Sequence, residues 1–266
     1  MKSMILGTGV SFGKEPEQAR TVISAALDNE ILCFDTAPSY KTEGILGEIL
    51  SCECANKGIN RDELYIQTKI DAWQMQDGNI EFFIEDALRK LKVEYLDALL
   101  IHWPIPEYMN ATWVKFQEAK KQRLVKKIGI CNVRIRQLLD YASFEPDIIQ
   151  IERHPLNNFE KEVAFCINNG MEIQAYSPLC KMDERIKNNE KIQRIAKKYG
   201  KDEGQVVLRW HLDTGVTPIF TTTKTSRVET YAHIDDFRLT KEEIGEVNSL
   251  NENYKMYLES VSCPGF

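Results

Sequence analysis

The sequence lacks any apolar run of the length that a membrane span requires, and it has no excess of positive charge. None of the apolar segments in its 266 residues reaches roughly 18 residues, which argues against a membrane-spanning helix. The net charge of -6 and the pI near 5.4 argue against a general nucleic-acid binder, because phosphate backbones require a basic face. The first residues lack the apolar region and cleavage site of a signal peptide, so we expect a cytoplasmic protein.

The seven cysteines lack the spacing of a zinc site and are an odd number. Cys52 and Cys54 lie one residue apart, and on a helix their thiols would point in different directions. We therefore expect reduced thiols and no metal. The glycines near residue 8 do not form Gly-x-Gly-x-x-Gly, which argues against an open dinucleotide-binding sheet.

Short apolar strands alternate with amphipathic helices along the whole chain. The pattern predicts eight strands, each followed by helical periodicity, which favours a closed (β/α)8 TIM barrel of the α/β class over an open doubly wound sheet. About 250 residues is typical of such a barrel, so we expect one domain over residues 1–266. The strands are expected near residues 6–10, 31–35, 64–69, 96–102, 127–132, 147–152, 171–176 and 217–220, and the helices near 15–29, 41–57, 80–91, 112–122, 134–143, 159–169, 190–199, 204–213, 225–232 and 241–250.

Polar side chains stand at the predicted carboxyl ends of most strands, where the active site of a barrel lies. Asp35, at the end of an apolar strand, requires a cation, and Lys69 is the best candidate. Tyr40 and His102 lie at exits close to them. We expect the lysine to lower the tyrosine pKa and make Tyr40 a general acid, with the imidazole orienting a carbonyl or sharing its proton. The alternatives are a structural Lys69–Asp35 ion pair and a histidine satisfied within the fold.

Motifs spread over nearly the whole chain resemble those of the aldo-keto reductases. They are Gly7-Thr8-Gly9, Phe34-Asp35-Thr36-Ala37 through Tyr40, Thr68-Lys69, Ile101-His102-Trp103-Pro104, Gly129-Ile130-Cys131-Asn132, Gln150-Ile151-Glu152 and Tyr176-Ser177-Pro178-Leu179. The resemblance implies a barrel that binds NADP(H) without a Rossmann domain and reduces carbonyls to alcohols. It makes Tyr40 the proton donor, Lys69 and Asp35 the pair that tunes it, and His102 the group that orients the substrate.

The resemblance also implies a cofactor site. Asn132 and Gln150 would hold the carboxamide, and Tyr176 would stack on the nicotinamide ring. The further positions expected at the cofactor are Gly9, Val10, Asp35, Cys131, Ser177, Leu179, Thr221, Thr222, Thr223, Lys224 and Arg227.

The adenosine-phosphate segment departs from the usual pattern of the family. It resembles the variant of some fungal-type keto-ester and diketone reductases. Lys224 and Arg227 still supply two cations for a 2′-phosphate, which favours NADP(H) over NAD(H). Cys131 replaces the serine that commonly precedes the asparagine, and a thiol is a weaker hydrogen-bonding group.

The substrate pocket is expected to be open. Its candidate residues are Ser11, where the family often has a tryptophan, together with Phe12, Asp71, Trp103 and His102. Asp71 is either a solvated loop charge or a group that selects a polar or cationic substrate. The chain begins almost at its first strand, without the N-terminal hairpin of many relatives, so we expect the helix over 241–250 to cover the bottom of the barrel or to pack on its side.

The leading hypothesis is an NADPH-dependent reductase of small aldehydes, ketones or α-dicarbonyls. One alternative is a regulatory barrel that binds the nicotinamide cofactor and acts through a protein partner without significant turnover. Another is a lyase or isomerase of phosphorylated substrates, against which the absence of a glycine-rich phosphate loop argues. We expect a monomer or weak dimer.

Overall fold

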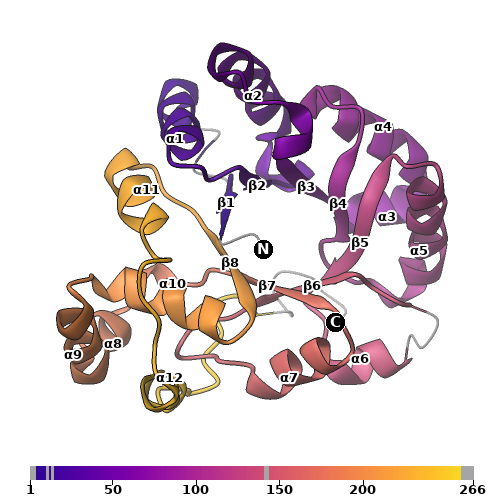
Figure 1. Ribbon diagram of the computed structural model, residues 1–266. Coiled ribbons are helices and arrows are strands. Elements are labelled where there is room, and N and C mark those ends of the chain that lie inside the picture. Colours follow the sequence, from indigo (N-terminus) through magenta and orange to yellow (C-terminus); the bar gives the residue numbers. More distant parts are fainter. Residues whose placement is uncertain (1–3, 10–11, 13–14, 141–143, 259–266) are drawn as a thin grey trace.

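The strands of the computed structural model, which describes residues 4–9, 12, 15–140 and 144–258, form one closed barrel (Figure 1). All neighbouring strands are parallel and follow the order of the chain, and the first strand pairs with the eighth. The predicted (β/α)8 barrel is therefore confirmed. The strands are β1 (Ile5–Gly7), β2 (Cys33–Asp35), β3 (Tyr65–Ile70), β4 (Leu96–Ile101), β5 (Val125–Cys131), β6 (Ile148–Glu152), β7 (Glu172–Tyr176) and β8 (Val216–Phe220).

Helices surround the barrel on all sides (Figure 1). They are α1 (Pro16–Asp28), α2 (Glu43–Lys57), α3 (Ala72–Asp77), α4 (Ile80–Leu91), α5 (Pro106–Lys121), α6 (Ile135–Asp140), α7 (Glu160–Asn168), α8 (Glu184–Lys187), α9 (Glu190–Tyr199), α10 (Glu203–Asp213), α11 (Thr225–Ala232) and α12 (Lys241–Asn248). Among the described residues, single turns of 3-10 helix include η2 (Pro38–Tyr40), η3 (Arg61–Glu63) and η4 (Cys180–Met182).

The helices differ from prediction at α5, α3 and α8, and the four-residue α8 lies where no helix was predicted. Helix α5 begins six residues before the expected residue 112, because a proline is well suited to the first turn of a helix. The short α3, directly after β3, was not predicted, since six residues carry too little periodicity. The last three residues of the helix expected over 134–143 lie outside the described residues.

Side chains on the strands alternate between two environments. Those that point outward pack against the helices in the main hydrophobic core, as Leu99 and Ile130 do. Those that point inward form a smaller apolar cluster that includes Ala98, Leu100 and Cys131. Polar inward side chains lie beside these apolar ones, because the register places Lys69 next to Leu100 and Gln150 next to Cys131. The polar side chains carry the candidate site.

Gly129 allows strands β5 and β6 to approach each other closely. A Cβ atom added at this position would lie 2.4 Å from the backbone oxygen of Ile148. Because real Cβ atoms do not tolerate such a contact, a larger residue would force the two strands apart. The glycine thus preserves the register that brings Cys131 opposite Gln150.

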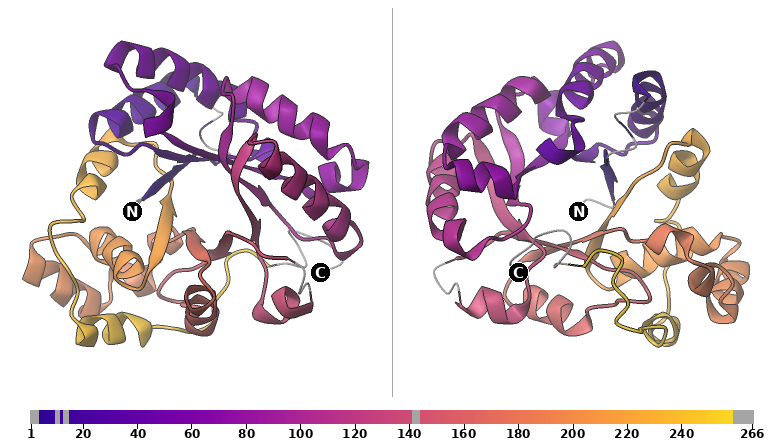
Figure 2. Two further views of the ribbon diagram at one scale, coloured as in Figure 1. Left: turned by 45° about the vertical axis from the view of Figure 1, so that its right-hand side comes forward. Right: turned by 180° about the vertical axis from the view of Figure 1, so that it is seen from behind.

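Helix α12 packs on the side of the barrel, against α9 and α10, rather than across its bottom (Figures 1 and 2). Of the two placements expected for the helix over 241–250, the bottom of the barrel is therefore wrong. The chain that follows α12 runs back to the barrel, where the backbone N–H groups of Met256 and Tyr257 donate to the Glu152 carboxylate at 2.6 and 3.0 Å. This segment brings Tyr257 to the mouth of the barrel.

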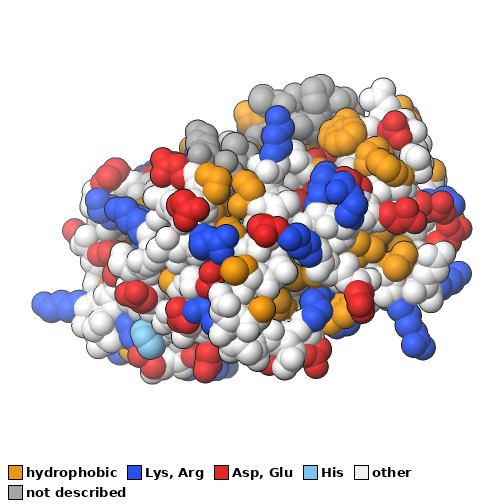
Figure 3. All heavy atoms as spheres, turned by 90° about the horizontal axis from the view of Figure 1, so that it is seen from above, with side chains coloured by type: hydrophobic (Ala, Val, Ile, Leu, Met, Phe, Trp, Pro, Cys, Tyr) orange, Lys and Arg blue, Asp and Glu red, His pale blue; other side chains and the backbone are white. Residues whose placement is uncertain are grey.

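Acidic and basic side chains are interspersed over the face shown in Figure 3. The surface of the described chain carries exposed ion pairs, such as Lys115 with Glu81 at 2.9 Å. None of the helices in the described ranges is long and apolar enough to cross a membrane.

Candidate active site

Lys69 and Asp35 form a buried ion pair between neighbouring strands. Lys69 lies near the end of β3 and Asp35 ends β2, and the Lys69 Nζ atom lies 2.8 Å from both carboxylate oxygens. The Lys69 side chain has no exposed surface, and Nζ also donates to the Thr36 carbonyl at 2.9 Å. Burial alone would lower the pKa of Lys69, but the Asp35 carboxylate outweighs it and raises this pKa above its usual value. Lys69 therefore remains an ammonium ion across the physiological pH range.

A layer of glutamines inside the barrel also holds Asp35. Gln67 and Gln150 donate from Nε2 to Asp35 Oδ2 at 2.6 and 3.3 Å, and both donate to Gln174 Oε1. Neither Gln67 nor Gln174 was predicted from the sequence as a site residue. The available signal was their spacing, because Tyr65, Gln67 and Lys69 share one face of β3 and a polar residue there points into the barrel.

Tyr40 lies above the ion pair, at the end of the short turn η2. The Lys69 Nζ atom lies 5.0 Å from the centre of the Tyr40 ring. Burial raises the pKa of Tyr40 to about 12, and the opposing effect of Lys69 only reduces that rise. The expectation of a tyrosine pKa below its normal value is therefore wrong, because loss of water around the phenolate outweighs the ammonium. In this structure Tyr40 holds its proton throughout the physiological pH range.

His102, which directly follows β4, completes the cluster. Its Nε2 atom lies 3.5 Å from the Tyr40 hydroxyl, and the two rings meet edge to face. Its Nδ1 atom lies 2.5 Å from Asp71 Oδ1. Burial is the largest cause that lowers the pKa of His102, and Lys69 adds to it, while Asp71 acts in the opposite direction. The imidazole is therefore neutral at pH 7.

The interpretation of Asp71 as a solvated or substrate-selecting charge is wrong. The residue is 5% exposed. Its carboxylate is held by His102 and by the backbone N–H and hydroxyl of Ser39, at 2.7 and 3.2 Å. Asp71 follows Ile70, the last residue of β3, and directly precedes α3. The turn at this position directs the Asp71 side chain toward the end of the neighbouring strand β4.

Asn132 and Tyr176 form the opposite wall of the site. Asn132 adopts a left-handed backbone conformation with φ of 61°, which asparagine tolerates better than most residues. Its side chain donates to the His102 carbonyl at 3.0 Å and accepts from the Tyr176 hydroxyl at 2.7 Å. Cys131 ends β5 opposite Gln150, is fully buried, and does not line the cleft described below, unlike its neighbour Asn132.

A cleft of about 810 Å³ opens over this cluster. It extends from Trp103 and His102, past Tyr176, to the exposed cation Arg227 on α11. Its walls include most of the residues expected at a cofactor or substrate, namely Gly9, Asp35, Tyr40, His102, Trp103, Asn132, Gln150, Tyr176, Ser177, Leu179, Thr221 and Arg227. Of Tyr254 and Tyr257, two candidates from the sequence for an apolar wall of the pocket, Tyr257 lines the cleft and Tyr254 does not. Lys181 and Met182 also line it and were not predicted, because their placement depends on loops that lack periodicity.

Several predicted positions do not line the cleft. Val10 and Ser11 lie outside the described residues. Phe12 is 3% exposed and packs in the main core, which corrects its expected place in the substrate pocket. Thr222 is buried and its hydroxyl bonds to the backbone of Lys224, so it shapes the loop after β8. Thr223 and Lys224 are exposed beside that loop.

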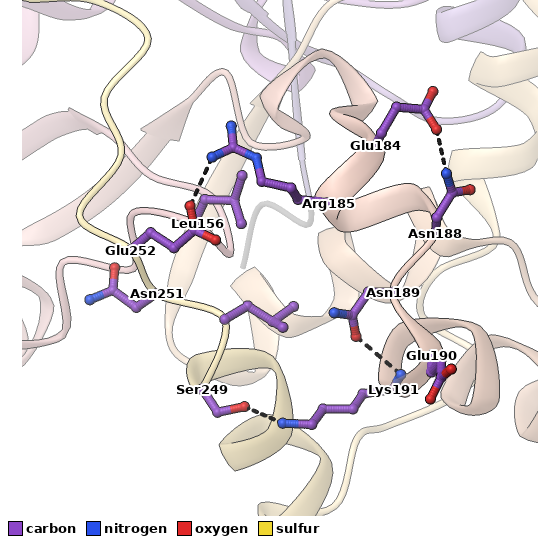
Figure 4. Close-up of a pocket in the computed structure, with 11 residues that line it drawn as sticks. Leu156, Glu184, Arg185, Asn188, Asn189, Glu190, Lys191, Ser249, Asn251 and Glu252 are labelled. Atoms are coloured by element: carbon purple, nitrogen blue, oxygen red, sulfur yellow. Dashed lines mark hydrogen bonds and ion pairs between the residues drawn. The ribbon is translucent and has the colours of Figure 1, made fainter.

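A second cleft, of about 580 Å³, lies between α8, α9 and the chain after α12 (Figure 4). Its polar side chains bond to one another, as Lys191 does to Ser249 at 2.7 Å and Arg185 to Glu252 at 2.8 Å. It holds no group that points to catalysis. No cluster of three or more possible metal ligands is present in the part of the chain that the structure describes.

Comparison with known proteins agrees with this geometry. The model of the "Aldo/keto reductase family" matches residues 3–252. The chain is 35% identical over 257 residues to methylglyoxal reductase DkgA of Escherichia coli strain K12, covering 94% of this chain and 90% of that protein. It is 31% identical over 256 residues to a glyoxal reductase of Bacillus subtilis strain 168, with the same coverage. The crystal structure of a Bombyx mori aldo-keto reductase in complex with NADP has a TM-score of 0.90 at 29% identity, covering 98% of this chain and 92% of that one.

Proposed function

The chain belongs to the aldo/keto reductase family and is an NADP(H)-dependent oxidoreductase of carbonyl compounds, and from this premise we propose that it reduces small aldehydes, ketones and α-dicarbonyls with Tyr40 as the proton donor. The observation that carries the proposal is the buried Lys69–Asp35 pair directly beneath the Tyr40 ring. A phenol in that position faces the cleft and has a fixed cation below it.

The pKa of Tyr40 suits an acid that must still hold its proton when the substrate binds. At a pKa of about 12, the hydroxyl is protonated in the resting enzyme. When it gives its proton to a carbonyl oxygen, the phenolate that forms is stabilised by the Lys69 ammonium, which burial prevents from being screened by water. The stabilisation is thus realised as charge develops, which is where an enzyme gains rate.

The residues along the cleft fit a dinucleotide cofactor. An added Cβ atom at Gly9 would meet no atom within 4 Å, so the backbone there is open to a ligand. Asn132, Gln150 and Tyr176 would hold the nicotinamide end, and Ser177, Leu179 and Thr221 the pyrophosphate. Arg227, Lys224 and the hydroxyl of Thr223 would hold the 2′-phosphate, which favours NADPH. When bound, NADPH would supply the hydride for the carbonyl carbon.

The names of the relatives support α-dicarbonyls as the substrate class, since two of them are a methylglyoxal and a glyoxal reductase. The cleft agrees with a small substrate. The aromatic residues of the cleft include Trp103, which directly follows His102, and Tyr257, whose ring centre lies 5.8 Å from that of Tyr176. The Tyr40 hydroxyl and His102 Nε2 lie 3.5 Å apart and offer polar groups to a carbonyl.

The test follows NADPH consumption with methylglyoxal in the wild type and in Tyr40→Phe. Loss of the proton donor should reduce kcat by about 10² to 10⁴, while the Kd for NADPH changes little. Tyr254→Phe removes a hydroxyl outside the cleft and should behave as the wild type. Full turnover in Tyr40→Phe would remove Tyr40 from the mechanism. Tight NADPH binding with no turnover by the wild type, across a panel of carbonyls, would instead favour a regulatory barrel.

A further inference from the structure

Asp71 lies directly behind His102 and is built into the fold on two sides. Its backbone N–H donates to Gln74 Oε1 at 2.9 Å where α3 begins. Its carboxylate receives the Ser39 N–H at Oδ2 and faces His102 Nδ1 at Oδ1. Burial would raise the pKa of Asp71, but the hydrogen bonds from His102 and Ser39 outweigh it and lower this pKa below its usual value. Asp71 is therefore a fixed anion at neutral pH.

This contact determines which nitrogen of His102 carries the proton. An ionised carboxylate only accepts hydrogen bonds, so Nδ1 must carry a hydrogen to bond to it. A neutral imidazole has one N–H, and its other nitrogen is then a bare acceptor. That nitrogen is Nε2, which faces the Tyr40 hydroxyl at 3.5 Å.

We propose that Asp71 is a positioning residue that holds His102 as its Nδ1–H tautomer and thereby makes His102 the group that exchanges a proton with Tyr40. The proposal rests on the proposed role of Tyr40 as the proton donor. It assigns His102 a task different from donating a hydrogen bond to the substrate as a neutral ring. With Asp71 behind it, Nε2 donates only when the ring carries both protons.

The proton balance of carbonyl reduction follows from this arrangement. When bound, NADPH would supply the hydride, with its electron pair, to the carbonyl carbon, and Tyr40 would give its hydroxyl proton to the carbonyl oxygen. The Tyr40 oxygen then takes the Nε2 proton of the His102 imidazolium, which returns to the neutral Nδ1–H form. Solvent restores the second proton. The net change is one hydride and one proton added to the substrate, with both residues regenerated.

Four ionisable groups of the described chain face His102, and together they set its titration. They are Asp71 behind it, Tyr40 in front, and Lys69 with Asp35 below. Burial and the Lys69 ammonium oppose a positive charge on the ring, and the carboxylates of Asp71 and Asp35 favour it. Removal of the Asp71 charge should therefore lower the pKa of His102 further. An opposite charge at such a distance is worth about one to three pKa units.

The decisive variant is Asp71→Asn, because the fold dictates how the amide must lie. The Ser39 N–H donates to Oδ2, so the remaining oxygen of Asn must stay there. The amide NH₂ group then faces His102 Nδ1 and donates to it. We expect the imidazole to change to its Nε2–H tautomer, with its only hydrogen directed at Tyr40.

The tautomer is measured by 15N NMR of the imidazoles, which does not depend on turnover. The chain has four histidines, and loss of one signal set in His102→Asn assigns the ring in question. We expect the Nδ1–H form in the wild type and the Nε2–H form in Asp71→Asn. An Nε2–H ring in the wild type, or no change in Asp71→Asn, would overturn the proposal whether or not Tyr40 proves to be the proton donor.

The pH profile of reduction provides the second test. Because reduction consumes the proton of His102, kcat/KM should fall as pH rises through the pKa of this ring. In Asp71→Asn, that decline should move about one to three units lower, so that activity at pH 7.5 falls about tenfold or more. In another enzyme, the same carboxylate-to-amide change behind a catalytic histidine gives the wrong tautomer and lowers kcat by about 10⁴. An unshifted decline with a normal tautomer change would also contradict the relay.

Gln74→Ala is the matched control for stability. It removes the other hydrogen bond that fastens Asp71 at the start of α3 but leaves the carboxylate against His102. Its Tm should fall, while its tautomer and pH profile should match the wild type. A shifted pH profile in Gln74→Ala would mean that Asp71 acts only through the stability of this turn.

Discussion

The two ends of the cleft are organised in opposite ways. At the exits of β2 and β3, Asp35, Lys69 and Asp71 are all at most 5% exposed, and each is bonded to a partner that the fold supplies. At the exit of β8, Lys224 and Arg227 are exposed, and among the described residues neither forms an ion pair. The charges at the end with Lys69 are all paired before a ligand binds, whereas the charges at the end with Arg227 are available to a ligand.

The difference follows from the tasks that the two ends have. A group that must stabilise charge in a transition state works best in a fixed, water-excluded place, where it needs no rearrangement. A group that holds a phosphate must exchange water for ligand at each turnover, and exposed arginine and lysine do so at low cost. We therefore expect changes at the first end to affect both stability and kcat, and changes at the second to affect KM alone.

The largest expected effect comes from Lys69→Met. This change leaves the Asp35 carboxylate buried without its cation, which should cost about 3 to 5 kcal/mol in the free energy of unfolding. Turnover should fall by at least about 10²-fold, measured with methylglyoxal at saturating NADPH. Urea unfolding measures the change in the free energy of unfolding. Lys90→Met, at a half-exposed lysine paired with Asp86 at 2.6 Å, should change neither quantity comparably. A stable Lys69→Met would show that the buried pair is not the support we describe.

A smaller effect is expected from Arg227→Ala. Loss of a phosphate-binding cation should raise the KM for NADPH about tenfold, in line with a charge-assisted hydrogen bond of about 1.5 to 3 kcal/mol. The KM for NADH should hardly change, and Tm should match the wild type. Lys121→Ala, at an exposed lysine on α5, serves as the control. Equal changes for both cofactors would place Arg227 at the pyrophosphate instead of the 2′-phosphate.

Ionic strength should separate the two ends without a mutation. Because exposed charges are screened within about 10 Å at 0.1 M salt, added salt should raise the KM for NADPH roughly twofold to fivefold. The buried pair is screened far less, so kcat should stay constant. A kcat that falls in parallel with the rise in KM would mean that solvent reaches Lys69.

The smallest effect tests whether a buried ion pair outside the cleft also contributes to the free energy of unfolding, as we expect of the pair in the cleft. Asp213 bonds to Arg209 at 2.6 Å. Burial would raise the pKa of Asp213, but the hydrogen bonds from Arg209, the Leu239 N–H and Arg238 outweigh burial and lower this pKa from its usual value of 3.8. A carboxylate whose pKa is lowered by folding contributes its full stability at pH values above its pKa in the unfolded chain. This contribution is lost as the pH falls through its pKa in the folded protein. Asp213→Asn should therefore lower the unfolding free energy at pH 7 and flatten its decline below about pH 4.

Urea unfolding of Asp213→Asn between pH 7 and pH 2.5 measures this effect, with the exposed Asp62→Asn as the control. Activity at pH 7 should remain, because Asp213 lies outside the cleft. An acid decline as steep as that of the wild type would show that other carboxylates carry it.

Most of the fold was predictable because it depends on local patterns. Alternation of short apolar strands with amphipathic helices predicts eight βα units, and parallel strands that arrive in this way close into a barrel. The same pattern indicated where Asp35, Lys69 and His102 leave their strands. It could not predict α3, which is six residues long, nor the path of the chain after α12, which depends on the Glu152 carboxylate more than ninety residues earlier.

By itself, the sequence determined the barrel, the exits at which polar residues stand, and the need of Asp35 for a cation, since each depends on residues within one strand and its turn. Only the tertiary structure decided that Asp71 lies against His102, that glutamines from two strands donate to Asp35, and that burial raises the pKa of Tyr40 above that of a free tyrosine. The physical reason is that a pKa and a hydrogen-bond partner are set by what surrounds a group in space. That surrounding exists only after distant strands have come together.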